Sequence, residues 1–173
     1  MRIKKVGILG GSFNPPHEGH LHIANLAVKN LDLDELWIAP AFENHLKKSS
    51  NYLSYPSRLK ACENLCKNHP QIMVKKFRYK FVYNLIKFLN SKFKNHQFFW
   101  VMGDDNLSNL HRWYRFEKLS RNLKFAVFLR QNSFIKNHHY PAVKMLKKFD
   151  NILIFNSPKI VISSTQIRKK FNA

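Results

Sequence analysis

Short apolar runs alternate along the chain with segments in which apolar residues recur every three or four positions. The runs cover residues 6–9, 36–39, 72–77, 98–102, 125–129 and 152–155. Short runs of this kind are typical of strands buried in a parallel sheet, and the spaced segments between them are typical of helices that pack on it. The alternation therefore predicts a parallel sheet covered by helices.

The helical spacing predicts three buried helix faces and a capped C-terminal helix. Ser163 followed by Gln166 forms a capping-box pattern at the head of the last segment. No repeat, linker or break in composition divides the chain, so we expect one α/β domain over residues 1–173, a Rossmann-like doubly wound parallel sheet with flanking helices. The polar loop of residues 42–55 has the length of a functional lid. The three faces comprise Leu21, Ala24, Val28 and Leu31; Leu59, Cys62 and Cys66; and Val82, Leu85, Ile86, Leu89 and Phe93.

A net charge of +20, from 30 basic and 10 acidic residues, indicates that the partners of the protein are anions. The basic residues are scattered in pairs rather than gathered in one stripe. A chain rich in Lys, Asn, Phe and Ile also follows from an AT-rich coding sequence without selection for binding. Nucleic acid is therefore not expected as the partner.

Two cysteines lie four residues apart in a helical pattern, which suits two thiols on one buried face better than a disulfide framework. The first apolar stretch is shorter than a signal sequence, and no later run reaches the length of a membrane span. We expect a cytoplasmic protein that does not enter membranes.

The segment GGSFNPPHEGH carries the clearest chemistry. It follows the first strand and opens the next helix, where glycines allow close backbone approach and the helix dipole favours a phosphate. His17 and His20, three residues apart, project from the same side of the first helical turn and can both donate to phosphoryl oxygens. Neither the dinucleotide fingerprint nor the H-E-x-x-H zinc spacing is present, and we expect no metal on His17, His20 and His22.

This segment resembles the loop of the HxGH nucleotidyltransferases, G-x-F-x-P-x-H-x-G-H, and matches it completely. The second motif of that family, I-S-S-T-x-I-R, is matched in full by ISSTQIR at residues 162–168. The resemblance implies that the second motif holds the ATP triphosphate opposite the histidines. The residues implied to bind ATP are Gly10, Gly11, Ser12, Phe13, His17, His20, Gly103, Ile162, Ser163, Ser164, Thr165 and Arg168.

Within the family, the chain is similar to the nicotinate-nucleotide adenylyltransferases. Gly103 to Leu107 resembles their G-x-D-N-L segment, and an aromatic residue follows it. The similarity implies that Asp105 contacts a ribose and that Trp113 stacks on the nicotinate ring, although Trp113 also fits a core position beside Phe116 and Leu119. The residues implied to bind the mononucleotide are Asn44, Lys47, Arg58, Asp105, Trp113 and Tyr114.

Three departures from that pattern all affect recognition of the acceptor. Residues 44–47 read NHLK where relatives often show N-P-x-K, and residues 82–85 read VYNL where relatives carry T-x-x-T, so both hydroxyls are missing. Asp104 adds a second carboxylate. The ATP motifs are intact.

The resemblance implies transfer of the adenylyl group of ATP, accompanied by Mg²⁺, to nicotinate mononucleotide, giving nicotinate adenine dinucleotide and pyrophosphate in NAD biosynthesis. The implied catalytic residues are His17, His20, Lys47 and Arg168, which would neutralise charge on the leaving pyrophosphate. Two alternatives remain. The acceptor could be nicotinamide mononucleotide, phosphopantetheine or a cytidylyl acceptor, or the chain could be a degenerate nucleic-acid-binding module. The sequence leaves the oligomeric state open.

Overall fold

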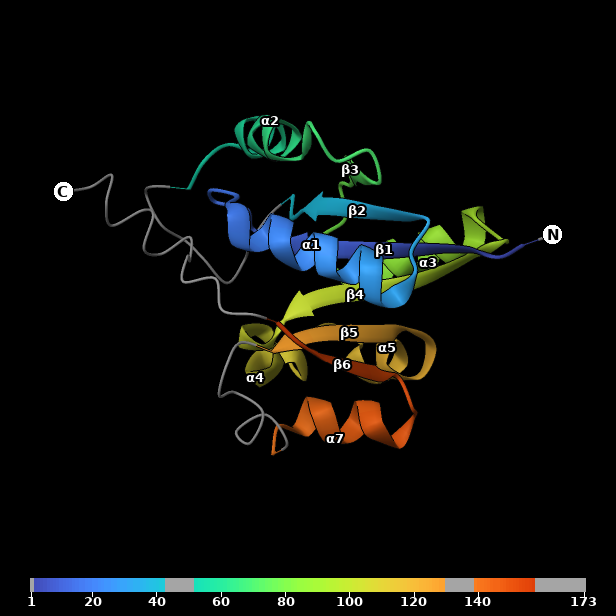
Figure 1. Ribbon diagram of the computed structural model, residues 1–173. Coiled ribbons are helices and arrows are strands. Elements are labelled where there is room, and N and C mark those ends of the chain that lie inside the picture. Colours follow the sequence, from blue (N-terminus) through green and yellow to red (C-terminus); the bar gives the residue numbers. More distant parts are fainter. Residues whose placement is uncertain (1, 43–51, 130–138, 158–173) are drawn as a thin grey trace.

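Six parallel strands form one sheet in the computed structural model, which describes residues 2–42, 52–129 and 139–157 (Figure 1). The order of the strands across the sheet is β3-β2-β1-β4-β5-β6, and every neighbouring pair is parallel. This order is that of a doubly wound sheet. The strands are β1 (Lys4–Gly11), β2 (Glu35–Pro40), β3 (Ile72–Val74), β4 (His96–Gly103), β5 (Lys124–Leu129) and β6 (Ile152–Asn156).

The sequence prediction of the strands is confirmed for all six, with one correction of length. The run at residues 72–77 leaves the sheet after three residues; β3 is an edge strand that pairs with β2 alone. Its pairing with β2 ends at Val74, and the amide of Lys75 makes one more bond to the carbonyl of Ile38. Phe77 then packs beside the Trp37 ring, with ring centroids 6.1 Å apart.

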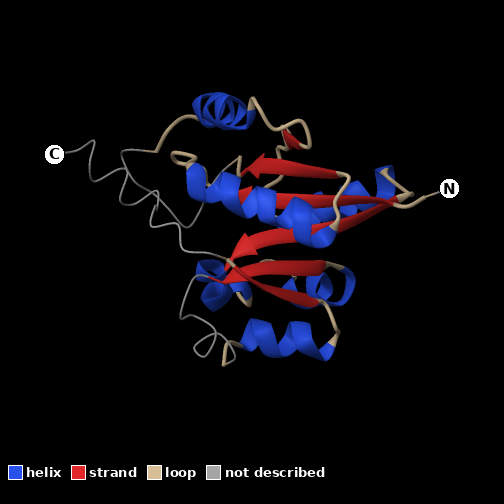
Figure 2. Cartoon of the chain, in the orientation of Figure 1, coloured by secondary structure: helices blue, strands red, loops and turns tan. Residues whose placement is uncertain are grey.

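Helices cover both faces of the sheet, as the secondary-structure colouring of Figure 2 shows. The apolar side chains of α1 and α2 belong to the cluster on one face, and those of α3, α4, α5 and α7 belong to the cluster on the other. The helices are α1 (Glu18–Leu31), α2 (Tyr55–Cys66), α3 (Val82–Lys92), α4 (Leu107–Leu110), α5 (Phe116–Asn122) and α7 (Pro141–Lys148), with a 3₁₀ turn η1 (Asp104–Asn106) before α4. The three predicted helix faces correspond to α1, α2 and α3.

Alternating side chains along each strand divide between the two clusters. In β4, Phe98, Trp100 and Met102 point to the face of α3, whereas Phe99 and Val101 point to the face of α1. Both faces of the central strands are therefore buried, which explains why the runs are apolar without interruption.

The parallel arrangement brings all the strand carboxyl ends to one edge of the sheet. The sheet order reverses between β1 and β4, since the chain moves outward through β2 and β3 and then returns to build β4, β5 and β6. In doubly wound sheets ligands bind at this reversal point. The turns after β1 and β4 are therefore where the site is expected.

The described helices include none that is both long and apolar enough to cross a membrane.

Two thiols lie on the buried side of α2. Cys62 and Cys66 are both free and buried. Burial raises the pKa of Cys62 to about 12, and burial raises the pKa of Cys66 to about 11. At neutral pH both side chains therefore remain protonated and behave as small apolar groups.

We predict that at pH 8 these cysteines react with iodoacetamide at least about 100-fold more slowly in the folded protein than free cysteine does, because the thiolate is the reacting form. Mass spectrometry of alkylated protein over time measures the rate. The same chain unfolded in guanidinium serves as the control and should react at the rate of free cysteine. Equal rates in the folded and unfolded chain would contradict the buried placement.

Candidate active site

The turn between β1 and α1 is irregular and tightly folded. Phe13 lies in the left-handed region with φ 47°, a conformation that costs an ordinary side chain about 1 kcal/mol or more. Its ring is buried, 1% exposed, and its centroid lies 4.8 Å from that of His20. Burial of this ring offsets the backbone cost and holds the turn beneath the head of α1.

The two histidines cap α1. The backbone N–H of Gly19 donates to Nδ1 of His17 at 3.1 Å, and the backbone N–H of His17 donates to Nδ1 of His20 at 3.2 Å. The two bonds form a capping box in which imidazoles take the usual places of Ser and Glu. Because both Nδ1 atoms accept, a neutral ring carries its proton on Nε2.

The imidazole rings lie together, with centroids 3.8 Å apart. The prediction that His17 and His20 project from one side of the first turn is therefore confirmed. Both Nε2–H groups are hydrogen-bond donors at a helix N-terminus, where the helix dipole also favours an anion. This is the geometry of a phosphate-binding site, while the catalytic roles of the two residues stay predictions.

A buried arginine braces the same turn. The guanidinium of Arg58, 1% exposed, donates to three backbone carbonyls: Ser12 at 2.8 Å, Leu53 at 3.1 Å and Phe42 at 3.4 Å. The rings of Tyr52 and Tyr55 lie 4.8 and 5.5 Å from it, which gives the charge two aromatic faces. Arg58 thus connects the turn after β1, the turn after β2 and the approach to α2.

The side chain of Asn14 adds a second link between the same segments. It is buried, and its Oδ1 accepts from the backbone N–H of Leu53 at 2.9 Å. The irregular turn is therefore held by side chain to backbone bonds from two directions.

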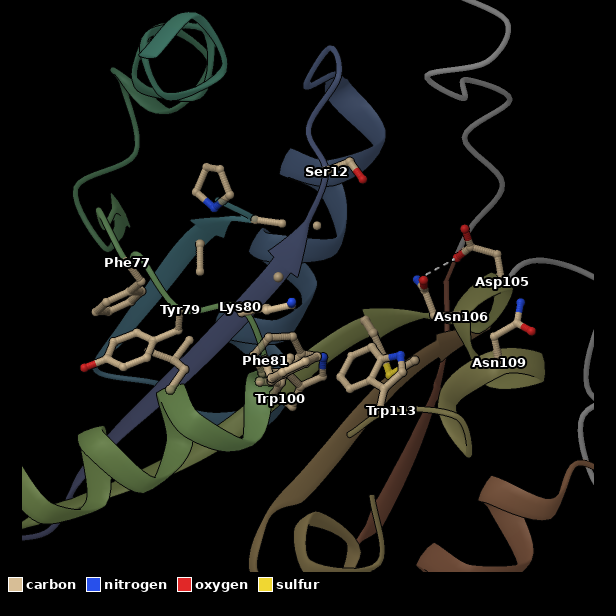
Figure 3. A pocket seen from close by; sticks show the side chains of 18 residues that line it. Ser12, Phe77, Tyr79, Lys80, Phe81, Trp100, Asp105, Asn106, Asn109 and Trp113 are labelled. Atoms are coloured by element: carbon tan, nitrogen blue, oxygen red, sulfur yellow. Dashed lines mark hydrogen bonds between the residues drawn. The ribbon is translucent and has the colours of Figure 1, made fainter. Parts of the chain in front are cut away.

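A pocket of about 490 Å³ opens at the carboxyl ends of β1, β2 and β4 (Figure 3). That volume is in the range of small-molecule sites. Its lining combines the glycine turn, the chain before α3 and the turn after β4. The lining residues are Gly10, Gly11, Ser12, Ala39, Pro40, Ala41, Phe77, Tyr79, Lys80, Phe81, Val82, Leu85, Trp100, Met102, Asp105, Asn106, Asn109 and Trp113.

Two tryptophans form one wall of the pocket. Trp100 and Trp113 meet edge to face, with centroids 5.6 Å apart and planes 89° apart. The indole of Trp100 packs so closely on Gly10 that a Cβ at that position would collide with it. The glycine is therefore required for this contact, and the wall stands directly beside the glycine turn.

The turn after β4 supplies the polar end of the pocket. Asp105 is exposed and its Oδ1 accepts from the Asn106 amide at 3.3 Å, whereas its neighbour Asp104 is buried. A Cβ at Gly103 would lie 2.9 Å from Oδ1 of Asp105, so the glycine leaves room for the carboxylate. An exposed carboxylate at this place can accept hydrogen bonds from sugar hydroxyls.

The structure brings many of the predicted site residues together. Gly10, Gly11, Ser12, Asp105 and Trp113 line the pocket. Trp113 is half-buried and also packs against the core, so its core contact is confirmed, while its stacking on the nicotinate ring stays a prediction. Asn44, Lys47, Ile162, Ser163, Ser164, Thr165 and Arg168 lie outside the described residues.

Two predicted mononucleotide contacts lie elsewhere. Tyr114 is exposed and stacks on Phe81, with centroids 4.6 Å apart, and it does not line the pocket. Arg58 gives its donors to backbone carbonyls. Direct contact of either residue with the mononucleotide stays a prediction.

Sequence reasoning missed the part of the pocket that precedes and begins α3. Lys80, Phe81 and Trp100 carried no motif, and the apolar run of β4 indicated only that Trp100 is buried. The departure from T-x-x-T at residues 82–85 was the available signal, since it drew attention to the segment next to Lys80 and Phe81.

A doubly wound sheet, with a pair of imidazoles that cap α1 and an aromatic pocket at the reversal point, is the arrangement of a nucleotidyltransferase. The cytidylyltransferase-like family model matches residues 8–170. The probable nicotinate-nucleotide adenylyltransferase of Fusobacterium nucleatum is 35% identical over 177 residues, which cover 96% of this chain and 86% of that protein. That of Agrobacterium fabrum is 31% identical over 182 residues, covering 94% and 97%.

The solved structures agree on the fold. Plasmodium falciparum nicotinic acid mononucleotide adenylyltransferase complexed with NaAD superposes with a TM-score of 0.77 at 23% identity, over 96% of this chain and 83% of that one. The chain belongs to the cytidylyltransferase-like family and, within it, to the nicotinate-nucleotide adenylyltransferases.

We predict that Arg58→Met lowers the free energy of unfolding by about 3 kcal/mol, because three carbonyls lose a charged donor at once. Arg58→Lys retains the charge but not the fork of donors, so its free energy of unfolding should lie between those of Arg58→Met and the unchanged protein. Urea unfolding measures each value. Lys60→Met, an exposed change on the same helix, is the matched control and should shift stability by less than about 0.5 kcal/mol. Equal stability of Arg58→Met and Lys60→Met would contradict the bracing role.

Proposed function

We propose that the protein transfers the adenylyl group of ATP to nicotinate mononucleotide, giving nicotinate adenine dinucleotide and pyrophosphate. The observation that carries the proposal is the placement of one turn, residues 10–12, between two sites. The paired imidazoles stand at the head of the helix that follows the turn, and the turn itself lines the aromatic pocket. The names of the relatives at 31% and 35% identity support the same reaction.

The chemistry needs no covalent enzyme intermediate. A phosphate oxygen of the mononucleotide forms a bond to the α-phosphorus of ATP, and the bond from that phosphorus to the oxygen bridging to the β-phosphorus breaks as pyrophosphate leaves. The attacking group is already an anion, so the residues have to position the reactants and neutralise charge that moves to the pyrophosphate. The Nε2–H donors of His17 and His20 suit this task, and Lys47 and Arg168 are proposed to join them.

The acceptor fits the pocket by its shape and polarity. Trp113 and Asp105 both line the pocket. A flat pyridine ring could stack on the indole of Trp113, and ribose hydroxyls could donate to the carboxylate of Asp105. The pocket is adjacent to Gly10 and Gly11, where the phosphate of the mononucleotide would meet ATP.

Magnesium is proposed to enter with ATP as part of the substrate. In the described part of the chain no three His, Cys, Asp or Glu side chains gather into a group that could hold an ion. The triphosphate and water would supply most of its ligands, as is usual for Mg²⁺ at nucleotide sites.

The direct test gives purified protein ATP, magnesium and one of three acceptors: nicotinate mononucleotide, nicotinamide mononucleotide or phosphopantetheine. Pyrophosphate release is measured. We expect release with the pyridine mononucleotides, fastest with the acid. No pyrophosphate release with any of the three acceptors, or release only with phosphopantetheine, would overturn the proposed reaction.

A pair of variants separates the capping bond of His20 through Nδ1 from its proposed donation through Nε2–H. His20→Asn keeps an acceptor near the place of Nδ1 but loses the Nε2–H donor, and we predict that turnover falls by about 100- to 1000-fold while stability is nearly unchanged. His20→Gln places an amide near Nε2 but loses the cap, so we expect stability to fall by about 1 kcal/mol with more turnover retained. Steady-state kinetics and urea unfolding give both values.

A result in which His20→Asn turns over as fast as the original protein would remove the Nε2–H group from catalysis. His20→Ala, which lacks both groups, is the reference for the pair and should show both defects.

A further inference from the structure

The pocket has one positive side chain in its described lining. Of the residues that line it within the described ranges, Lys80 is the only Lys or Arg and Asp105 the only Asp or Glu. Figure 3 shows them on opposite sides of the pocket, Lys80 with Phe81 and Trp100, and Asp105 on the turn after β4. The pocket is therefore polarised from one end to the other.

Lys80 lies at the edge of the aromatic wall. Its Nζ is 5.5 Å from the ring centroid of Phe81, and its side chain extends toward the middle of the pocket in Figure 3. No carboxylate of the described residues forms an ion pair with it. Its charge is therefore available to a ligand on that side of the pocket, next to the surface against which a flat ring would lie.

The neighbouring helix offers little else on that side. The residues of α3 that line the pocket are Val82 and Leu85, and both are apolar. A ring substituent held there meets Lys80 as its charged partner within the described lining. An anionic substituent gains a charge-assisted hydrogen bond, and a neutral amide gains much less.

We propose that Lys80 determines the preference of this enzyme for the acid over the amide mononucleotide by pairing with the carboxylate on the pyridine ring. The inference rests on the proposed function, because it assigns the acceptor half of that reaction. It places the ring carboxylate at Lys80 and the ribose at Asp105, so the polarity of the pocket matches the polarity of the acceptor.

The test compares kcat/KM for nicotinate mononucleotide with kcat/KM for nicotinamide mononucleotide. We expect Lys80→Met to lower the acid-to-amide ratio by about 10-fold or more, the scale of one charged hydrogen bond. Most of the change should be in KM for the acid. Lys80→Arg keeps the charge and should restore much of the ratio.

Lys76→Met is the matched control, because Lys76 is exposed on the same connection and does not line the pocket. The ratio should be unchanged in that variant. An equal loss with both acceptors in Lys80→Met would overturn the proposal, since it would place Lys80 at the phosphate that both acceptors share. An unchanged ratio would overturn it as well.

The original protein distinguishes this failure from failure of the proposed function. If it releases pyrophosphate with nicotinate mononucleotide while Lys80→Met keeps the same ratio, only the role of Lys80 is lost. If the original protein releases no pyrophosphate with any acceptor, the proposed function itself fails.

Discussion

The guanidinium of Arg58 holds together the segments on which the site depends. The turn after β1 is neither helix nor strand, so its backbone groups need partners from elsewhere in the chain, and the carbonyl of Ser12 accepts a charged donor from Arg58. Arg58 supplies that partner and binds the turns around Phe42 and Leu53 at the same time. A single buried charge therefore sets the relative positions of two strand ends and the approach to α2, and the tyrosines around it limit the cost of its burial.

The contact between Gly10 and Trp100 is the second constraint on the site. It brings the end of β1 and the wall formed by β4 into one surface, so the glycine turn and the aromatic pocket have a fixed separation. Transfer between two bound reactants depends on that separation, since misplacement of either by about 1 Å costs much of the rate. The glycine serves the packing of the indole as well as the approach of a phosphate.

Much of the fold followed from the sequence because burial on both faces leaves continuous apolar runs. All six strands and the faces of α1, α2 and α3 were predictable from this pattern. The end of β3 was not, because the sequence does not show that an edge strand loses its partner after Val74. The bracing role of Arg58 was not predictable either, since its burial and its carbonyl partners arise only from long-range folding.

The glycine turn with its histidines could be recognised from the sequence, whereas the pocket proposed for the acceptor could not, and the reason is physical. Phosphate is bound by backbone N–H groups, glycines and a helix head, which need particular residues at adjacent positions and so leave a motif. The acceptor pocket is built from side chains on separate segments, where Trp100 and Trp113 meet only after β4 and α4 are in place. Such a surface can exchange a hydroxyl for a charge without disturbing the fold. The apolar first turn of α3 and the nearby Lys80 line this surface, and no motif marks the residue to which we assign the choice between acid and amide.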